Sequence, residues 1–302
     1  RAMALGIFDI HCADLASLFS VRQAFEFSSC DYLAQVFHCA AAGGDWGEYE
    51  DFYRSNALGT KNMVQAVSER VSPRFERFIH LSTIDVYPHD VPPSQCDEYT
   101  PIPTHNRRYH YTETKSMAEQ FVKESSLPWT MLRLGVVFGA GSYSWGLQEA
   151  ILLKKGLGVM IDGSRHHAGL VHVDDASRGI IDASRSQHTV RRIYNMTGCQ
   201  NVTWRKFYNT LADELGVDRP TLSIPYWLAY WIAIVLEFIW RVFDLPDRPL
   251  LTLFVLRIVG QPQLWPTESA RHDFHWREQV PFEKAIKKQA NWIRHSSDYF
   301  FA

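Results

Sequence analysis

Short apolar runs alternate with longer amphipathic segments through the first half of the chain. The apolar runs at residues 6–11, 35–39, 77–82 and 130–137 predict strands, and the segments at 53–69 and 109–124 predict helices. Strands that alternate with helices of this length are typical of βαβ units. The sequence therefore predicts an α/β protein with a Rossmann-like, doubly wound parallel sheet.

A second, smaller lobe is expected beyond residue 140. A strand at 193–198 and a helix at 203–216 precede two apolar stretches, at 226–236 and 250–259. Neither stretch reaches the ~20 apolar residues that a membrane-spanning helix needs, and Glu237 and Arg241 follow the first one closely. The sequence allows two interpretations: a buried pair of helices, or a patch that rests in a bilayer surface. Trp227, Trp231 and Trp240 favour the membrane surface.

Composition narrows the classes of function. The 302 residues are 46% hydrophobic with a net charge of −2, which describes a globular chain long enough to bury a large core. No basic tract suggests binding to nucleic acid. The five cysteines and thirteen histidines show no metal-ligand spacing, so we expect no metal site and reduced thiols.

The most informative pair is Tyr111 and Lys115, which share one face of the helix predicted at 109–124. An ammonium group beside a phenol favours the phenolate, so we expect Lys115 to lower the pKa of Tyr111. Thr83 ends the strand that precedes this helix and would bring a hydroxyl to the same site. A threonine there is also compatible with a simple turn role. The three residues together predict a device for moving a proton on or off an alcohol.

Several other polar residues allow two interpretations. Asn56 is either a helix-surface residue or a brace for the catalytic strand through backbone hydrogen bonds. Asp175 is expected to be a helix N-cap. His172 either reaches the active site or satisfies a hydrogen bond in the core. Asp85 lies close to Thr83 and is preceded by Ile84.

Seven stretches follow one another in the order of a known family. Together they resemble the extended short-chain dehydrogenases/reductases, the NAD-dependent epimerase/dehydratase group, and most of all its branch of 3β-hydroxysteroid and sterol-4α-carboxylate 3-dehydrogenases. The stretches are Ala13-Asp14-Leu15, Val36-Phe-His-Cys-Ala-Ala41, Asn56-Ala-Leu-Gly-Thr60, His80-Leu-Ser-Thr-Ile-Asp-Val-Tyr87, Tyr111-Thr-Glu-Thr-Lys115 with Ala118-Glu119, Leu132-Arg-Leu-Gly-Val-Val-Phe-Gly139 and Val171-His-Val-Asp-Asp175.

The resemblance implies a site and a cofactor. Thr83, Tyr111, Lys115 and Asn56 would be the catalytic residues, and the cofactor would be NAD, with NADP left open. The cofactor-binding residues implied are Asp14, Leu15, Cys39, Ala40, Ala41, Ser82, Tyr111, Lys115, Leu134, Val136 and Val137. Asp14 resembles the aspartate that meets the adenine amino group, and no Gly-rich phosphate turn precedes it. By this comparison the first two βα units are missing.

The resemblance also implies an organisation and an activity. Residues 1–140 would form an incomplete dinucleotide-binding domain, and residues 141–302 a substrate lobe with apolar helices at about 225–260 and parts that return to the sheet. The expected reaction is oxidation of a 3β-hydroxyl on a steroid or sterol, with decarboxylation or isomerisation as further steps. A nucleotide-sugar epimerase/dehydratase and a non-catalytic paralogue stay open as alternatives. So do a homodimer and contact with the endoplasmic reticulum membrane from its cytoplasmic side.

Overall fold

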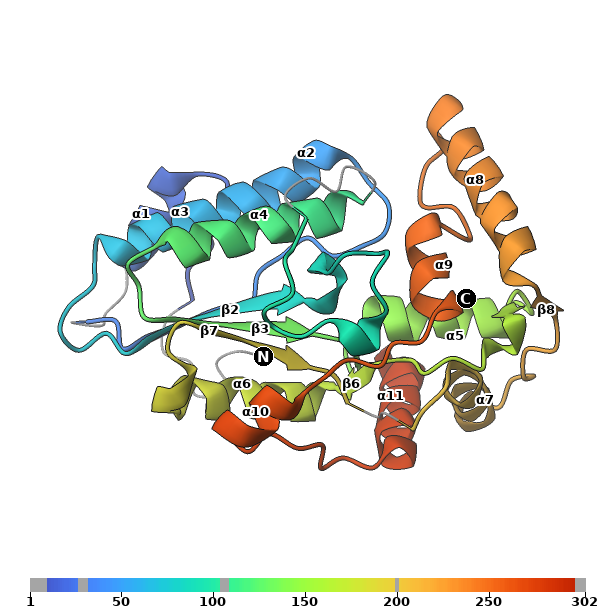
Figure 1. The fold of residues 1–302 in the computed structure, drawn as a ribbon. Helices are drawn as coiled ribbons and strands as arrows, with labels where there is room; N and C mark the ends of the chain where they lie inside the picture. Colours follow the sequence, from blue (N-terminus) through green and yellow to red (C-terminus); the bar gives the residue numbers. More distant parts are fainter. Residues whose placement is uncertain (1–9, 27–31, 104–108, 199–200, 297–302) are drawn as a thin grey trace.

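The centre of the protein is a parallel sheet of four strands. The computed structural model describes residues 10–26, 32–103, 109–198 and 201–296. The strands lie in the order β1 (Gln35–His38), β2 (Arg77–Thr83), β3 (Trp129–Leu134) and β7 (Arg192–Met196), and all neighbours are parallel. Helices cover both faces of this sheet (Figure 1). The predicted α/β, Rossmann-like fold is confirmed.

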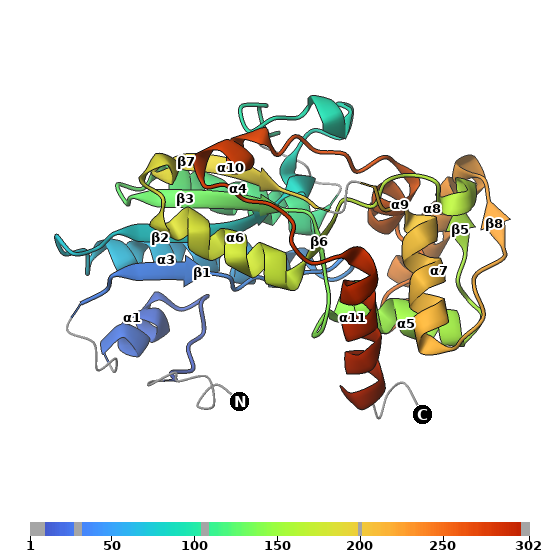
Figure 2. The ribbon, with the colours of Figure 1, turned by 90° about the horizontal axis from the view of Figure 1, so that it is seen from below.

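Alternating side chains of the central strands build two cores, one on each face. Phe78 and Met131 point toward the face covered by α3 (Gly59–Ser68) and α4 (His110–Glu124), together with α1 (Leu18–Glu26). Ile79 and Leu132 point to the opposite face, against α6 (Val173–Arg185) and α10 (Glu268–Asp273). Figure 2 shows α6 and α10 on this second face. The sheet is therefore buried on both sides, as a parallel sheet requires.

The apolar run at 130–137 forms two strands instead of the one predicted. β3 ends at Leu134, and β4 (Val136–Phe138) pairs with β6 (Leu170–His172) in a separate small sheet. The change of partner takes place at Gly135, where a Cβ atom would lie 2.4 Å from the carbonyl oxygen of Gly169. Only glycine allows this close approach.

The helix predicted at 53–69 is interrupted. It consists of α2 (Tyr49–Phe52), a π-helical turn at Tyr53–Leu58 and α3. Such turns are rare and often accompany functional sites. The π turn carries Asn56, and a Cβ atom at Gly59 would lie 3.1 Å from the Cβ atom of Leu15, so the turn packs closely on the N-terminal segment. Most of the strand predicted at 6–11 lies outside the described residues, and Ile10 and His11 belong to no strand.

The second lobe is mostly helical. Its elements are α5 (Glu149–Lys154), α7 (Trp204–Leu215), α8 (Tyr226–Val242), α9 (Leu253–Gly260), α11 (Phe282–Ser296) and the two-stranded pair β5 (Met160–Ile161) and β8 (Ser223–Ile224). These elements share one apolar core around Trp204, Phe207 and Ile286. The strand predicted at 193–198 does not belong to this lobe, because it forms β7 at the edge of the main sheet.

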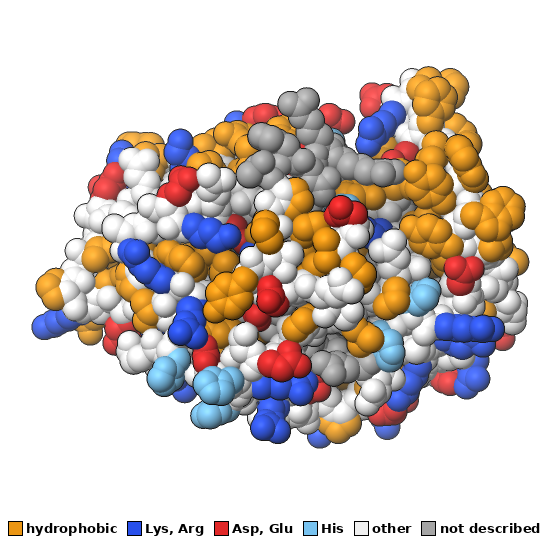
Figure 3. Space-filling model, in the orientation of Figure 1, with side chains coloured by type: hydrophobic (Ala, Val, Ile, Leu, Met, Phe, Trp, Pro, Cys, Tyr) orange, Lys and Arg blue, Asp and Glu red, His pale blue; other side chains and the backbone are white. Residues whose placement is uncertain are grey.

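Helix α8 projects from the second lobe with an apolar face toward solvent (Figures 1 and 3). Trp227 and Trp231 are 64% and 60% exposed, and Phe238 is also exposed. Its two charged residues are engaged: the Glu237 carboxylate accepts a hydrogen bond from the backbone N–H of Leu253, and the Arg241 guanidinium lies over the ring of Trp46. Among the described residues, no helix has the length and apolar character needed to cross a membrane.

Candidate active site

A cleft of about 360 Å³ opens where β1, β2 and β3 end. The carboxyl ends of parallel strands are where doubly wound proteins bind ligands. The structure brings most of the predicted site residues to the walls of this cleft, and we call it the candidate cleft. The predicted residues that line it are Cys39, Ala41, Ser82, Thr83, Tyr111, Lys115, Leu134, Val136 and Val137.

The Thr83 hydroxyl is hydrogen-bonded to Asp85. It donates a hydrogen bond to the Asp85 carboxylate over 2.8 Å and accepts one from the Asp85 backbone N–H over 3.2 Å. The second bond caps the 3₁₀ turn at Ile84–Val86, so Thr83 does have a turn role. The Tyr111 phenol lines the same cleft as this hydroxyl. Burial raises the pKa of Asp85, and the nearby Arg257 guanidinium opposes this rise.

Tyr111 differs from the prediction in its acidity. Burial, followed by the Asp85 carboxylate, raises the pKa of Tyr111 above its usual value, and only the hydrogen bond with Thr83 lowers it. The expectation that Lys115 lowers the pKa of Tyr111 is therefore wrong. A phenol held in its protonated form is suited to donating a proton.

Lys115 lies on the same helix, one turn after Tyr111, and is almost fully buried. Its ammonium group donates a hydrogen bond to the backbone carbonyl of Leu81 over 2.5 Å. Burial lowers the pKa of Lys115 to about 8, although Glu119 and Cys39 raise it in part. The ammonium is thus directed to the catalytic strand β2.

Asn56 is buried, so its interpretation as a helix-surface residue is wrong. Its amide accepts a hydrogen bond from the Ala42 N–H over 2.8 Å and donates to the Ala42 carbonyl over 3.0 Å. The amide also donates to the Thr114 hydroxyl in α4 over 3.1 Å. Asn56 therefore braces the loop after β1, and not the catalytic strand, against the helix that carries Tyr111 and Lys115.

Beneath the cleft, a buried ion pair supports the end of β2. Arg133 and Glu119 form two hydrogen bonds of 2.9 and 2.8 Å, and both side chains are 1% exposed. Ser82 donates to the same carboxylate over 2.7 Å, and the Arg133 guanidinium lies over the ring of Tyr87. Burying two charges is costly unless they are paired and hydrogen-bonded. Here Nε and Nη2 of Arg133 are bonded to Glu119, whereas its Nη1 is buried without a hydrogen-bond partner among the described residues.

The predicted adenine side of the site is a shallow hollow. Asp14, Leu15, Ala40 and Ala41 line it. Asp14 is exposed, and its carboxylate lies 3.7 Å from the Arg54 guanidinium. The side chains that follow β1 are small, so a flat group could approach the backbone there. These residues and those of the candidate cleft fit parts of a bound NAD.

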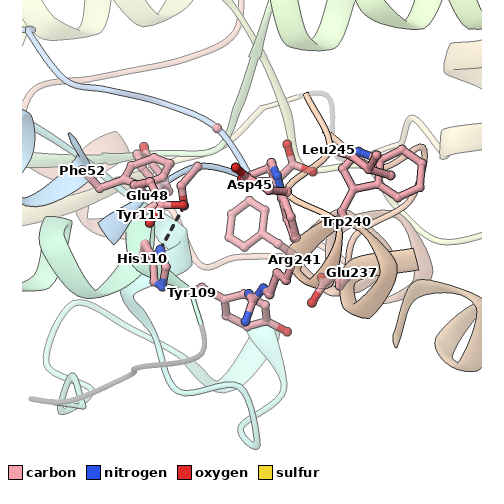
Figure 4. A pocket seen from close by; sticks show the side chains of 15 residues that line it. Asp45, Glu48, Phe52, Tyr109, His110, Tyr111, Glu237, Trp240, Arg241 and Leu245 are labelled. Carbon is pink, nitrogen blue, oxygen red and sulfur yellow. Dashed lines mark hydrogen bonds between the residues drawn. The ribbon is translucent and has the colours of Figure 1, made fainter. Parts of the chain in front are cut away.

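A further hollow of about 290 Å³ adjoins the candidate cleft at Tyr111 (Figure 4). One wall carries Phe52 and His110, and the other carries Trp240, Arg241 and Leu245 from the region of α8. The hollow and the cleft share Asp45 and Phe254 as wall residues. The second lobe therefore faces the predicted catalytic tyrosine directly.

The sequence interpretation missed Asp45, Glu149, Arg248 and Phe254. Arg248 donates a 2.7 Å hydrogen bond to Asp45, and Phe254 packs edge-on against Tyr111 with ring centroids 6.3 Å apart. These contacts join residues that lie far apart in the sequence, and no local spacing predicts them. The only local signal is that Asp45 follows two glycines at the end of a predicted strand.

The prediction that Asp175 is a helix N-cap is wrong, because His172 takes that position. His172 is the N-cap of α6, because its Nδ1 accepts a hydrogen bond from the Asp174 N–H over 3.3 Å. Asp175 is buried in the first turn, where its carboxylate accepts hydrogen bonds from the backbone N–H groups of Gln279 and Val280. Neither residue lines the candidate cleft.

In the described ranges, no group of three or more histidine, cysteine or acidic side chains is placed to hold a metal ion. The candidate cleft instead combines a phenol, a hydroxyl, an ammonium and apolar walls at the ends of parallel strands. Such a combination of groups is chemically able to move a proton to or from a bound oxygen.

The chain belongs to the NAD dependent epimerase/dehydratase family, which matches residues 2–197. A 2-alkyl-3-oxoalkanoate reductase of Stenotrophomonas maltophilia is 24% identical over 84% of this chain and 78% of its own. A decarboxylating sterol-4-alpha-carboxylate 3-dehydrogenase of Mus musculus is 23% identical over 87% of this chain and 75% of its own.

Solved structures show the same fold. The UDP-glucuronic acid 4-epimerase of Bacillus cereus, in complex with NAD, superimposes with a TM-score of 0.69 and 16% identity, over 98% of this chain and 84% of the epimerase. The epimerase Mth375 of Methanothermobacter thermautotrophicus gives a TM-score of 0.73 and 16% identity, over 96% and 79% of the two chains. The family therefore rests on the match over residues 2–197, and the solved structures confirm the fold.

Proposed function

We propose that this protein is an NAD(P)-dependent oxidoreductase that interconverts a secondary alcohol and a ketone on a steroid-like or sterol-like substrate. The observation that carries the proposal is the meeting of the Tyr111 phenol, the Thr83 hydroxyl and the Lys115 ammonium in one cleft at the strand ends. Its catalytic residues would be Thr83, Tyr111 and Lys115, with Asn56 as a positioning residue.

The proton would move through Tyr111. In the direction of reduction, the phenol donates its proton to the ketone oxygen, and the Thr83 hydroxyl holds that oxygen. The raised pKa of Tyr111 suits this role of acid. In the direction of oxidation, the same oxygen of Tyr111 accepts the proton from the alcohol. When bound, the nicotinamide supplies or accepts the hydride.

Residues of the cleft would hold that cofactor. Ala41 and Cys39 follow β1, and Leu134, Val136 and Val137 line the opposite side. Lys115 would bind the ribose next to the nicotinamide, and Asp14 and Leu15 would meet the adenine end. These assignments rest on the motifs of the family and on the placement of the residues around the two hollows.

The apolar character of the second lobe supports a lipid-like substrate. Trp145, Phe254 and Ile258 line the candidate cleft opposite the sheet. The relatives named above act, by their names, on a 2-alkyl-3-oxoalkanoate and on a sterol carboxylate, and each name denotes a compound with a large apolar part. A nucleotide sugar would instead place charged phosphates against these walls, at a high desolvation cost.

We further propose that α8 rests in a membrane surface. Tryptophan and phenylalanine side chains of α8 are exposed, and the two charged side chains of α8 contact other parts of the protein. Such a helix is typical of the interface between a membrane and water. A bilayer is also where a sterol-like substrate would be found.

The proposal is tested by following the oxidation of NADH and NADPH with three classes of substrate: a 3-keto steroid, a 2-alkyl-3-oxoalkanoate and a UDP-sugar. We expect turnover of the steroid ketone, and a loss of about 10²–10⁴-fold in kcat/KM in Tyr111→Phe. Tyr99→Phe, at an exposed position, is the control. Unchanged turnover in Tyr111→Phe would refute the assignment, and reaction with the UDP-sugar alone would favour an epimerase.

A further inference from the structure

A separate apolar cavity of about 380 Å³ lies inside the second lobe. Leu153 of α5, Ile161 of β5, Ile232 and Leu236 of α8, and Val259 of α9 contribute to its walls. We call it the lobe pocket. Three of its wall residues have polar groups in their side chains, namely Glu149, Tyr208 and Arg248.

The three polar residues gather at one place. Burial and then the Glu149 carboxylate raise the pKa of Tyr208, and Arg248 opposes that rise, so the three groups interact with one another. Arg248 is itself held by the Asp45 carboxylate at 2.7 Å. The rest of the lobe pocket therefore presents hydrocarbon, where an unpaired polar ligand group would lose its hydration without compensation.

Two of these polar residues, Glu149 and Arg248, lie between the lobe pocket and the candidate cleft. Glu149, Arg248 and Val255 are wall residues of both cavities. The two cavities therefore adjoin at these residues, and a ligand that reaches from Tyr111 into the apolar walls would have to pass Glu149 and Arg248. At the rim of the lobe pocket, Leu222 and Leu250 are 58% and 57% exposed.

We propose that the lobe pocket binds the apolar end of a lipid substrate whose oxygen-bearing end lies at Tyr111 and Thr83. Glu149 and Arg248 then flank the middle of the ligand, where polar substituents would be tolerated. This subsite rests on the proposed function for the orientation of the ligand, but its apolar binding is a property that can be measured without turnover.

The test uses a fluorescent fatty acid, cis-parinaric acid, and variants that fill the pocket. Leu236→Trp places a large ring in the lobe pocket, whereas Val235→Trp places the same ring at the neighbouring, exposed position of α8. We expect Leu236→Trp to weaken binding about tenfold or more, because each displaced methylene loses its burial. We expect Val235→Trp to bind as the wild type does.

Ile232→Trp, at another wall position of α8, provides a second filling variant in case Leu236→Trp does not fold. The proposal is overturned if the wild type does not bind the probe, or if the filled variants bind it as the wild type does. Equal weakening by Val235→Trp would place the probe on the outer face of α8 and also overturn it.

Binding and catalysis separate this subsite from the proposed function. If the filled variants lose the probe while no ketone is reduced by the wild type, the subsite stands and the proposed function fails. If the wild type reduces ketones and the filled variants keep the same KM for long-chain and steroid substrates, the proposed function stands and the subsite fails. If both hold, filling raises KM for substrates with a long apolar part and leaves KM for short ketones unchanged.

Discussion

The Thr83 hydroxyl donates its hydrogen bond to the Asp85 carboxylate over 2.8 Å, which places Asp85 next to the site at Tyr111. The same carboxylate repels a negative charge on Tyr111 and raises its pKa. Asp85 is therefore a positioning residue that keeps the phenol protonated.

Replacing Asp85 by asparagine should lower the pKa of Tyr111, because the repulsion by the carboxylate disappears. Ultraviolet difference spectroscopy of tyrosinate formation, with Tyr111→Phe as the background, measures this pKa. A pKa that is unchanged or higher in Asp85→Asn would contradict the role of Asp85. In an active enzyme, the limb of the pH–rate profile that reports Tyr111 should move to lower pH together with the spectroscopic value.

Breaking the buried ion pair should destabilise the protein strongly. Glu119→Gln leaves the Arg133 guanidinium buried without its counter-charge, which typically costs about 3–5 kcal/mol. The control is Glu69→Gln, which breaks the exposed pair with Arg22 and should leave the free energy of unfolding nearly unchanged. Urea unfolding curves of both variants measure the difference. Equal free energies of unfolding for the two variants would show that the buried ion pair stabilises the protein no more than the exposed one.

Glu149 should make the stability depend on pH. Burial, reinforced by the charge of Asp45, raises the pKa of Glu149 from 4.5 to about 7. Ionisation of a carboxyl with a raised pKa opposes folding, so its favourable contribution is complete below pH 4.5 and is lost as the pH rises through about 7.

Glu149→Gln removes this titration. The variant should gain stability over the wild type as the pH rises, by an amount on the order of 1–3 kcal/mol at full ionisation. Urea unfolding at about pH 5 and about pH 8 measures both proteins. If the difference in the free energy of unfolding between the variant and the wild type does not increase with pH, ionisation of Glu149 does not destabilise the fold.

The exposed aromatic face of α8 should bind vesicles. A double variant, Trp227→Ser with Trp231→Ser, is expected to weaken binding to phospholipid vesicles by about tenfold or more, because two large apolar side chains no longer enter the bilayer surface. Tyr99→Ser with Tyr143→Ser, at exposed aromatic positions outside α8, is the matched control. Flotation with the vesicles measures both. Equal retention of the two variants on vesicles would exclude α8 as the contact.

The sequence predicts the parts of this protein that depend on local pattern. The strands at 77–82 and 35–39 and the helix at 109–124 differ from β2, β1 and α4 by one residue at an end, because hydrophobic period and strand length determine them. The meeting of Thr83, Tyr111 and Lys115 in one cleft follows from the topology of such sheets.

Other features depend on contacts that no local pattern records. The break at Gly135 arises because two strands change partners there, and the π turn at Asn56 accompanies hydrogen bonds to Ala42 and Thr114. The acidity of Tyr111 was predicted with the wrong sign, because burial and Asp85 act on the phenol and the spacing to Lys115 says nothing of either.

The pairing of Asp45 with Arg248 joins positions 203 residues apart, and Phe254, Val255 and Ile258 complete the same wall of the cleft. One side of the cleft is therefore built by residues that are synthesised after the rest of the site. A polypeptide that stops before residue 248 would retain Tyr111 and Lys115 but would lack this wall, so its cleft would lie open to solvent there.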